Sequence, residues 1–273
     1  MDTQTFFTTH PVFTVDEFDR YLESCGSGSR FSRNRLLGYY RATNRLISVR
    51  NGLYAVAAPG ADPESSPVDS FLVASALRKD SVLAYHTALE LHGFAHSLRE
   101  EGQILTCHPM SARFEFRGVR YRTVQPSAAL PDEDALSLGV ITASRGYLAV
   151  RVTGIERTLV DCLDRLRLAG GYEEVWRAYE SVTYLDLELT VRYALLLSNA
   201  TTIASVGYFL EMQRTRWMVS DDYLERLAAH RPDHKHYLDR SRSAPGKLVS
   251  RWNLVVPEAV FYRTWEEPDE PLA

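Results

Sequence analysis

Lysine, cysteine and long apolar runs are scarce in this sequence of 273 residues. The three cysteines, Cys25, Cys107 and Cys162, are too few and too dispersed for a disulfide framework, so we expect reduced thiols in a cytoplasmic protein. No apolar stretch reaches the ~18 residues that a membrane-spanning helix requires. The polar start Met1–Gln4 lacks the basic and apolar regions of a signal peptide. We therefore expect no membrane partner and no export.

The overall composition is that of an ordinary globular protein, with 45% hydrophobic and 24% charged residues. The length predicts about two domains. A net charge of −4 gives no global sign of nucleic-acid binding. Only three of the 31 basic side chains are lysines, and a genome's base composition alone can produce such an arginine bias. The placement of the arginines is therefore more informative than their number.

Acidic residues are absent between Glu23 and Asp62, and this stretch carries six arginines. A local charge of this size within an acidic chain can supply the salt-dependent, phosphate-binding part of nucleic-acid affinity. The alternative is a solvated surface whose arginines pair with acids from elsewhere in the fold. The six arginines are Arg30, Arg33, Arg35, Arg41, Arg45 and Arg50.

The residues around this patch predict two helices. Thr14 and Glu17 fit a capping box, and apolar residues at helical spacing follow to about Ser24. A Gly/Ser segment at residues 26–29 then interrupts the helix. Ser32 is a candidate cap for a second helix that runs from Arg33 to about Arg45.

Two β-rich runs joined by Asn51-Gly52 follow the second helix, and this dipeptide is typical of a tight hairpin. A helical unit followed by a two-stranded wing is the plan of a winged helix-turn-helix domain. We assign that domain to residues 1–62 and a larger mixed domain to residues 63–273.

The second helix is predicted to have an apolar and a basic side. At ~100° per residue, Leu36, Tyr39, Thr43 and Leu46 share one side of the helix. Of these, we expect Leu36, Tyr39 and Leu46 to pack on Phe18 and Leu22. Arginine can bind guanine or phosphate, asparagine can bind adenine, and tyrosine hydroxyls bind phosphate. Arg35 lies outside the predicted basic arc. The predicted DNA-binding residues are Arg33, Asn34, Tyr40, Arg41, Asn44 and Arg45 on the helix, with Arg50 and Asn51 at the wing tip.

The rest of the chain alternates helical and strand patterns, so the predicted fold class is α+β, with a helical C-terminal portion. The helices are expected at 68–78, 81–92, 154–169, 172–182, 187–198, 203–212 and 222–229. The strands are expected at 103–108, 113–124, 147–152, 252–257 and 260–265.

No motif in the sequence is specific for catalysis or metal binding. His86, His92 and His96 sit around one predicted helix and its following turn, and His86 and His92 are six residues apart, which is not the spacing of a helical ligand pair. His230, His234 and His236 form at most a weak zinc signal in a turn. No glycine-rich phosphate loop or nucleophile elbow occurs. We therefore expect no catalytic residue, no metal, no cofactor and no enzymatic activity.

Several segments in order resemble the AbiEi family of antitoxins from type IV toxin–antitoxin, or abortive-infection, systems. The similarity covers most of residues 14–257. It departs from many relatives before the second helix, where the chain is short, rich in Gly and Ser, and without a clear separate first helix of the helix-turn-helix. The segments are Arg45–Tyr54, Tyr85–Gly93, Val152–Asp161, Gly170–Trp176 and Gly207–Glu211.

The resemblance implies two roles. The winged helix-turn-helix domain of such a protein binds inverted repeats in double-stranded DNA of its own promoter and represses the operon. The C-terminal domain is needed to neutralise a nucleotidyltransferase-like toxin encoded beside it. A palindromic site requires two copies of the protein, which form a dimer either in solution or on the DNA.

Three other functions are compatible with the sequence. The protein could be a winged-helix regulator that senses a ligand and has no toxin partner. It could be an enzyme, such as a nuclease, with an N-terminal DNA-targeting region. It could also be an adaptor whose basic helix binds an acidic protein.

Overall fold

The computed structural model describes residues 3–26, 29–240 and 244–265 and has a mixed α+β fold. It divides into two compact units, each assembled from several stretches of the chain. The first consists of residues 1–83, 100–125 and 141–152, and the second of residues 84–99, 126–140 and 153–273. The predicted α+β class is confirmed, whereas the winged helix-turn-helix domain and its boundary at residue 62 stay predictions. No helix among the described residues has both the length and the apolar character needed to cross a bilayer.

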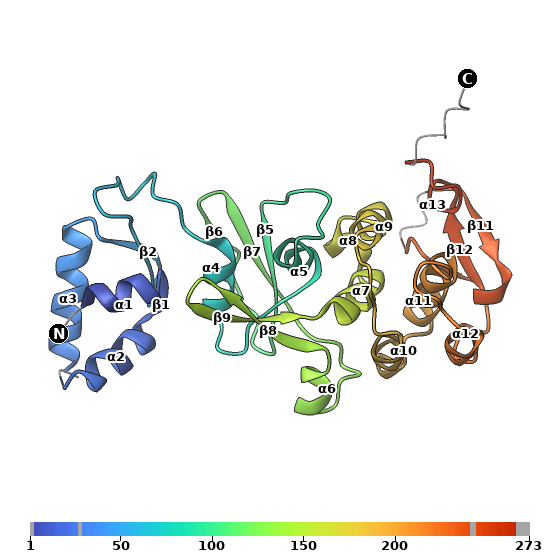
Figure 1. Cartoon of the computed structure of the whole chain (residues 1–273), viewed down its shortest axis with the longest axis horizontal. Helices are drawn as coiled ribbons and strands as arrows, with labels where there is room; N and C mark the ends of the chain where they lie inside the picture. The colour runs from blue at the N-terminus through green and yellow to red at the C-terminus, as the bar shows by residue number, and fades with distance from the viewer. Residues whose placement is uncertain (1–2, 27–28, 241–243, 266–273) are drawn as a thin grey trace, which may run out of the picture. The chain divides into compact units, whose positions relative to one another are not determined.

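The first unit begins with three helices and a small antiparallel sheet, drawn in blue in Figure 1. The strand order in this sheet is β1-β3-β2, so β3 is paired on both sides. The elements are α1 (Thr3–Thr9), β1 (Val12–Thr14), α2 (Val15–Ser24), α3 (Arg30–Ala42), β2 (Leu46–Arg50) and β3 (Leu53–Val56).

Local sequence signals account for α2 and the hairpin. The Glu17 amide donates to the Thr14 hydroxyl, and the Thr14 amide donates to the Glu17 carboxylate at 2.6 Å, which confirms the predicted capping box. Gly52 adopts a φ of +78° in the turn between β2 and β3, a conformation that suits glycine. The cap of α3 is Ser29 rather than the predicted Ser32, because the Ser32 amide donates to the Ser29 hydroxyl. Residues 27 and 28 of the predicted Gly/Ser break lie outside the described residues.

Aromatic rings fill the space between the three helices and the small sheet. Phe6 and Phe7 of α1 are almost completely buried and contact Phe13 and Phe18 at centroid distances of 5.1–6.2 Å. Helix α1 was not predicted from the sequence, yet it covers much of this core. Leu22, Leu37 and Leu46 complete the buried cluster.

A six-stranded mixed sheet forms the rest of the first unit, with the order β6-β7-β5-β4-β9-β8. β5 pairs in parallel with β7, and β4 pairs in parallel with β9, while β6–β7 and β4–β5 are antiparallel. The strand expected at 113–124 is divided into β6 and β7 by a turn at Arg117-Gly118, where both residues have a positive φ. The strands are β4 (Val82–Leu83), β5 (Glu101–Leu105), β6 (Phe114–Phe116), β7 (Val119–Val124), β8 (Val140–Arg145) and β9 (Leu148–Thr153), and α4 (Ser70–Ala76) packs on β5.

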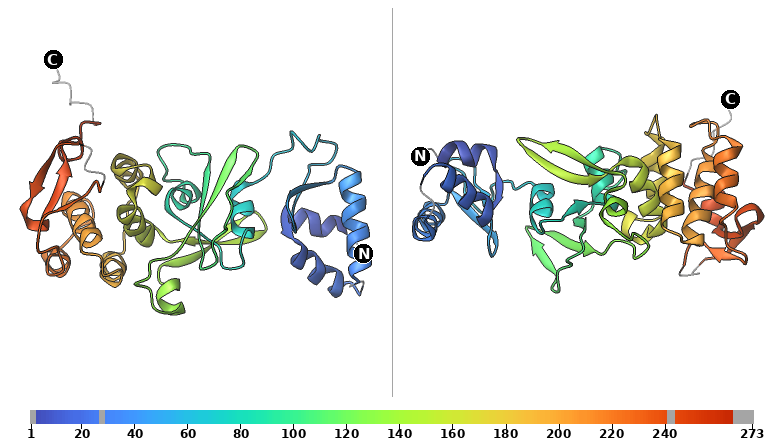
Figure 2. Two further views of the ribbon diagram at one scale, coloured as in Figure 1. Left: turned by 180° about the vertical axis from the view of Figure 1, so that it is seen from behind. Right: turned by 90° about the horizontal axis from the view of Figure 1, so that it is seen from below.

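The second unit is mainly helical and ends in a small sheet of order β10-β12-β11; its part from residue 153 onward is drawn in yellow to red in Figures 1 and 2. Its helices are α5 (Tyr85–His92), α6 (Glu133–Ser137), α7 (Ile155–Asp164), α8 (Leu166–Ala169), α9 (Tyr172–Glu180), α10 (Leu187–Leu196), α11 (Ala200–Met212), α12 (Asp221–Ala228) and α13 (Glu258–Phe261). The strands are β10 (His236–Tyr237), β11 (Gly246–Val249) and β12 (Leu254–Pro257), with a 3-10 turn η1 (Ser250–Trp252) before β12.

Two predicted elements in these regions are wrong. The helix expected at 81–92 starts only at Tyr85, because Val82 and Leu83 form a buried strand that pairs with both β5 and β9. The strand expected at 260–265 is absent, because residues 260–261 belong to the short helix α13 and residues 262–265 form turns. In both places a short apolar run fits either a helix or a strand. At Val82 and Leu83 the pairing with β5 and β9 favours the strand, whereas after Pro257 the chain forms the helix α13.

Candidate nucleic-acid interface

Helix α3 contains four arginines and no carboxylate. Asn34 and three of the arginines, Arg30, Arg35 and Arg41, are exposed. Within the described part of the chain, these three guanidinium groups have no ion pair or hydrogen bond. Phe31 and Tyr39 are also exposed on this helix, at 77% and 61%. Helix α3 therefore offers solvent a cationic surface with aromatic rings beside it.

The buried side of α3 differs from the predicted side by roughly a quarter turn. Leu37 is buried, Leu36 and Tyr40 pack against the aromatic core, and Tyr39 and Thr43 are exposed. Of the three residues expected to pack on Phe18 and Leu22, Leu46 belongs to the same buried cluster as those two and Leu36 packs against that cluster, whereas Tyr39 is exposed. The reason is α1, because Phe7 of this unpredicted helix contacts the Tyr40 ring at 4.9 Å and fixes the rotation of α3.

Arg33 occupies a position unlike the other arginines of α3. Its Nη1 lies 2.5 Å from the Asp19 carboxylate on α2, and its side chain is only 16% exposed. Its Nε donates to the side-chain oxygen of the neighbouring Asn34 at 3.1 Å. Arg33 therefore connects α2 to α3, and its charge is neutralised within the fold rather than offered to a partner.

Two further predicted contact residues point back into the domain. The Tyr40 hydroxyl is hydrogen-bonded to the Thr3 hydroxyl, so it faces α1. Arg45 donates from Nη1 to the Ala57 carbonyl at 2.6 Å and from Nη2 to the Gln4 side chain at 3.3 Å. These contacts give Tyr40 and Arg45 structural roles. Asn44 is exposed and has a φ of +58°, a conformation that asparagine tolerates better than most residues.

The two residues predicted to bind DNA at the wing tip, Arg50 and Asn51, differ in their exposure and contacts. Asn51 is exposed in the turn between β2 and β3. Arg50 instead lies over the Phe114 ring, 5.7 Å from its centroid, and donates to the Met110 sulfur at 3.2 Å. Asn51 is thus open to a partner, whereas Arg50 is engaged within the first unit.

Sequence reasoning missed Arg30 and Arg35 as exposed cations. Arg30 precedes the predicted start of the helix, and Arg35 was excluded because it lay close to the predicted apolar side. The signal that could have found them was the pair Leu37 and Tyr40, which defines a second possible apolar side of the same helix.

No group of three or more His, Cys, Asp or Glu side chains among the described residues is arranged to hold a metal ion. His86 is fully buried, with Nδ1 3.1 Å from Glu90 and Nε2 3.3 Å from Glu174. His236 is hydrogen-bonded to Thr201.

One nuclease-like spacing is present in the chain. Asp233 and Lys235 stand two residues apart, as in restriction-type nucleases. Both are exposed in the segment between α12 and β10. Asp233 belongs to no metal-binding group of acidic residues, because the described residues contain no such group.

The comparisons with known proteins bear on the fold alone. No family model matches the sequence, and no curated protein matches it. Among solved structures, the chain is similar to the Rv2827c protein from Mycobacterium tuberculosis, with a TM-score of 0.59 and 17% identity. The alignment covers 94% of this chain and 90% of that chain. The two chains therefore share an architecture over nearly their whole lengths.

Proposed function

We propose that the first 62 residues form a winged helix-turn-helix domain that binds double-stranded DNA through α3. The element order α1-β1-α2-α3-β2-β3, with a three-stranded antiparallel sheet, is the order of that fold. In helix-turn-helix proteins the second helix of the motif enters the major groove and the first crosses the backbone. Helix α3 takes the first of these positions and α2 the second.

The observation that carries this proposal is the carboxylate-free, exposed side of α3. Arg30, Arg35 and Arg41 are unpaired within the described residues, so no internal ion pair has to break before they meet phosphate or guanine. Asn34 can bind adenine edges from the same surface. This set replaces the one expected from the sequence, because Arg33, Tyr40, Arg45 and Arg50 are engaged inside the fold.

The resemblance to AbiEi antitoxins extends the proposal to a biological role. The protein represses its own operon by binding inverted repeats in the promoter as two copies, and it counteracts a nucleotidyltransferase-like toxin encoded beside it. The second unit supplies antitoxicity in this account. Four of the five resembling segments lie wholly or almost wholly in that unit, and Arg45–Tyr54 lies in the first.

DNA binding and repression are tested together with the gene's own upstream region. We expect the full-length protein to shift that fragment in a gel and to protect an inverted repeat from cleavage, whereas a scrambled fragment of equal length binds only at low salt. A reporter driven by the same region should be repressed by the wild type and released by the double variant Arg35→Ala/Arg41→Ala. Equal binding to both fragments would contradict the regulatory role.

Antitoxicity is tested by co-expression with the adjacent gene. The wild type should rescue growth, and so should the Arg35→Ala/Arg41→Ala variant when both are driven from a foreign promoter, because neutralisation does not use α3. If DNA binding holds but no rescue occurs, the protein is a regulator without a toxin partner. If the variant loses rescue while remaining folded, the assignment of the two roles to separate units is wrong.

A further inference from the structure

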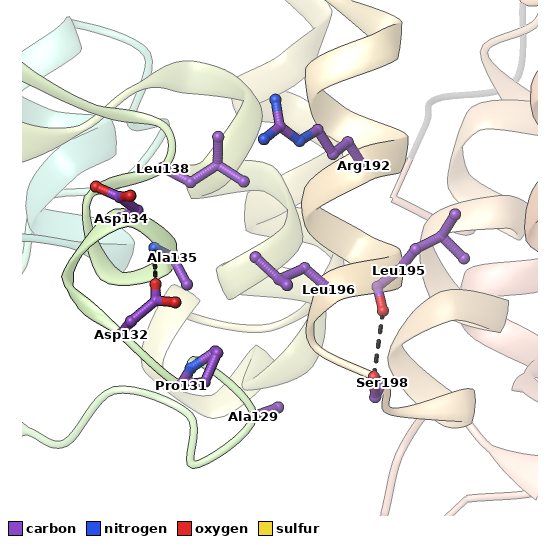
Figure 3. A pocket seen from close by; sticks show the side chains of 10 residues that line it. All are labelled: Ala129, Pro131, Asp132, Asp134, Ala135, Leu138, Arg192, Leu195, Leu196 and Ser198. Atoms are coloured by element: carbon purple, nitrogen blue, oxygen red, sulfur yellow. Dashed lines mark hydrogen bonds between the residues drawn. The ribbon is translucent and has the colours of Figure 1, made fainter.

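A pocket of about 640 Å³ opens in the second unit between α6 and α10 (Figure 3). Its volume lies in the range of about 300–1,000 Å³ that small-molecule sites occupy. One wall comes from residues 129–138, and the other comes from the C-terminal half of α10 and the residues that follow it. The lining residues are Ala129, Pro131, Asp132, Asp134, Ala135, Leu138, Arg192, Leu195, Leu196 and Ser198.

Opposite charges stand on the two walls of this pocket. Arg192 on α10 is exposed, and within the described residues its guanidinium has no hydrogen bond or ion pair, only a longer-range interaction with Glu188. On the facing wall, Asp132 accepts the Ala135 amide at 2.8 Å and is thereby occupied as the cap of α6. The Asp134 carboxylate is exposed and, within the described residues, accepts no hydrogen bond. The pocket thus presents one available cation and one available anion.

Leucine side chains also line this pocket. Figure 3 shows Leu138 between Asp134 and Arg192, and Leu196 farther along the α10 wall between Ala135 and Leu195. Leu138, Leu195 and Leu196 are each half-buried, so part of their apolar surface remains in contact with water. A ligand that covers this surface would gain the free energy of apolar burial.

A single buried ion pair on α7 holds both walls in place. Arg157 is 2% exposed, and its Nη1 donates to the Leu136 and Leu138 carbonyls at 2.6 and 2.8 Å, which anchors the end of α6. Its partner Asp161 accepts the hydroxyl of Tyr193, the neighbour of Arg192 on α10, at 2.9 Å. Two walls more than fifty residues apart in the chain are therefore fixed to one point, as in a preformed site.

We propose that this pocket binds a short zwitterionic peptide with apolar side chains. The peptide carboxylate lies on Arg192, its ammonium group lies on Asp134, and its side chains cover the leucines. Arginine matches a carboxylate through paired N–H donors, and the two charges discriminate against ligands that carry only one. This ligand site lies outside the DNA-binding surface proposed above, and it would make the protein responsive to peptides.

Isothermal titration calorimetry on the full-length protein tests the site with dileucine as the probe. We expect saturable binding of one peptide per chain. N-acetyl-dileucine lacks the ammonium group and dileucine amide lacks the carboxylate, so each should bind about tenfold more weakly. Arg192→Gln should lower the affinity for dileucine by about tenfold and leave the affinity for dileucine amide unchanged. Asp134→Asn should likewise lower the affinity for dileucine by about tenfold and leave the affinity for N-acetyl-dileucine unchanged.

Two matched controls separate the site from general charge effects. Glu133 is the exposed neighbour of Asp134 on α6 and does not line the pocket, and Arg167 is an exposed arginine on α8. Glu133→Gln and Arg167→Gln should bind dileucine like the wild type. The proposal is overturned if dileucine does not bind, if the blocked peptides bind equally well, or if the control variants lose as much affinity as the pocket variants.

Discussion

The rotation of α3 can be tested by comparing Leu37→Ala with Tyr39→Ala. Leu37 is 5% exposed within the aromatic cluster, and truncating a leucine buried to this extent costs about 2–5 kcal/mol. Tyr39 is 61% exposed and contacts mainly the edge of Tyr40, so its loss should cost at most about 1 kcal/mol. A helix with Tyr39 inside would give the opposite order.

The assay has to report on α3 itself, because all four tryptophans lie in the second unit. Hydrogen–deuterium exchange of peptides from α3 meets this requirement. A destabilisation of about 3 kcal/mol corresponds to an opening equilibrium raised about a hundredfold, so exchange in Leu37→Ala should accelerate by about that factor. Tyr39→Ala should accelerate it about fivefold or less. Equal acceleration in both variants would refute the assigned orientation.

Two further predictions concern the second unit. Gly207→Ala should destabilise it by about 1–3 kcal/mol, because the added Cβ would lie 2.2–2.6 Å from ring carbons of the fully buried Trp252. Urea unfolding followed by tryptophan fluorescence measures this loss, and an unchanged unfolding midpoint would contradict the packing of Gly207 against Trp252. Burial raises the pKa of Glu174, but hydrogen bonds from Ser97 and the His96 amide outweigh it and hold the pKa below its ordinary 4.5. Its ionised form therefore stabilises the fold above about pH 4.5, and this contribution is lost as the pH falls through the lowered pKa. The Glu174→Gln variant should therefore be less stable than the wild type at pH 7, and its free energy of unfolding should fall less steeply in acid.

Elements with complete local signals were predictable from the sequence. Helix α2 starts where the Thr14–Glu17 capping box places it, and the Asn51-Gly52 turn joins the expected hairpin. The C-terminal end of α5 at Gly93 also follows the pattern, because that glycine adopts the left-handed conformation with a φ of +76°. In each case the residues that determine the structure are adjacent in the chain.

Elements determined by distant contacts were not predictable in the same way. Helix α1 has seven residues, too few for a clear helical period, and its stability comes from burying Phe6 and Phe7. β1 has three residues and exists because β3 pairs with it. The rotation of α3 depends on α1, so one missed helix shifted the predicted contact surface as well.

The candidate site shows the same division. The absence of acidic residues between Glu23 and Asp62 is plain in the sequence, and α3 within this stretch carries four arginines and no carboxylate. Which arginines are open is a matter of pairing across the fold, as the bonds from Arg33 to Asp19 and from Arg45 to the Ala57 carbonyl demonstrate. The concentration of basic residues could therefore be predicted from the sequence, whereas which of them are exposed and unpaired could not.

The salt dependence of DNA binding distinguishes the exposed arginines of α3 from the arginine that is paired within the fold. Each phosphate contact contributes about 0.9 to the slope of log affinity against log salt concentration. Arg35→Ala and Arg41→Ala should each weaken binding and flatten that slope by about one contact, whereas Arg33→Ala, with its guanidinium already paired to Asp19, should leave the slope unchanged. DNA binding through the exposed side of α3 is refuted if Arg33→Ala flattens the slope while Arg35→Ala and Arg41→Ala retain the wild-type value.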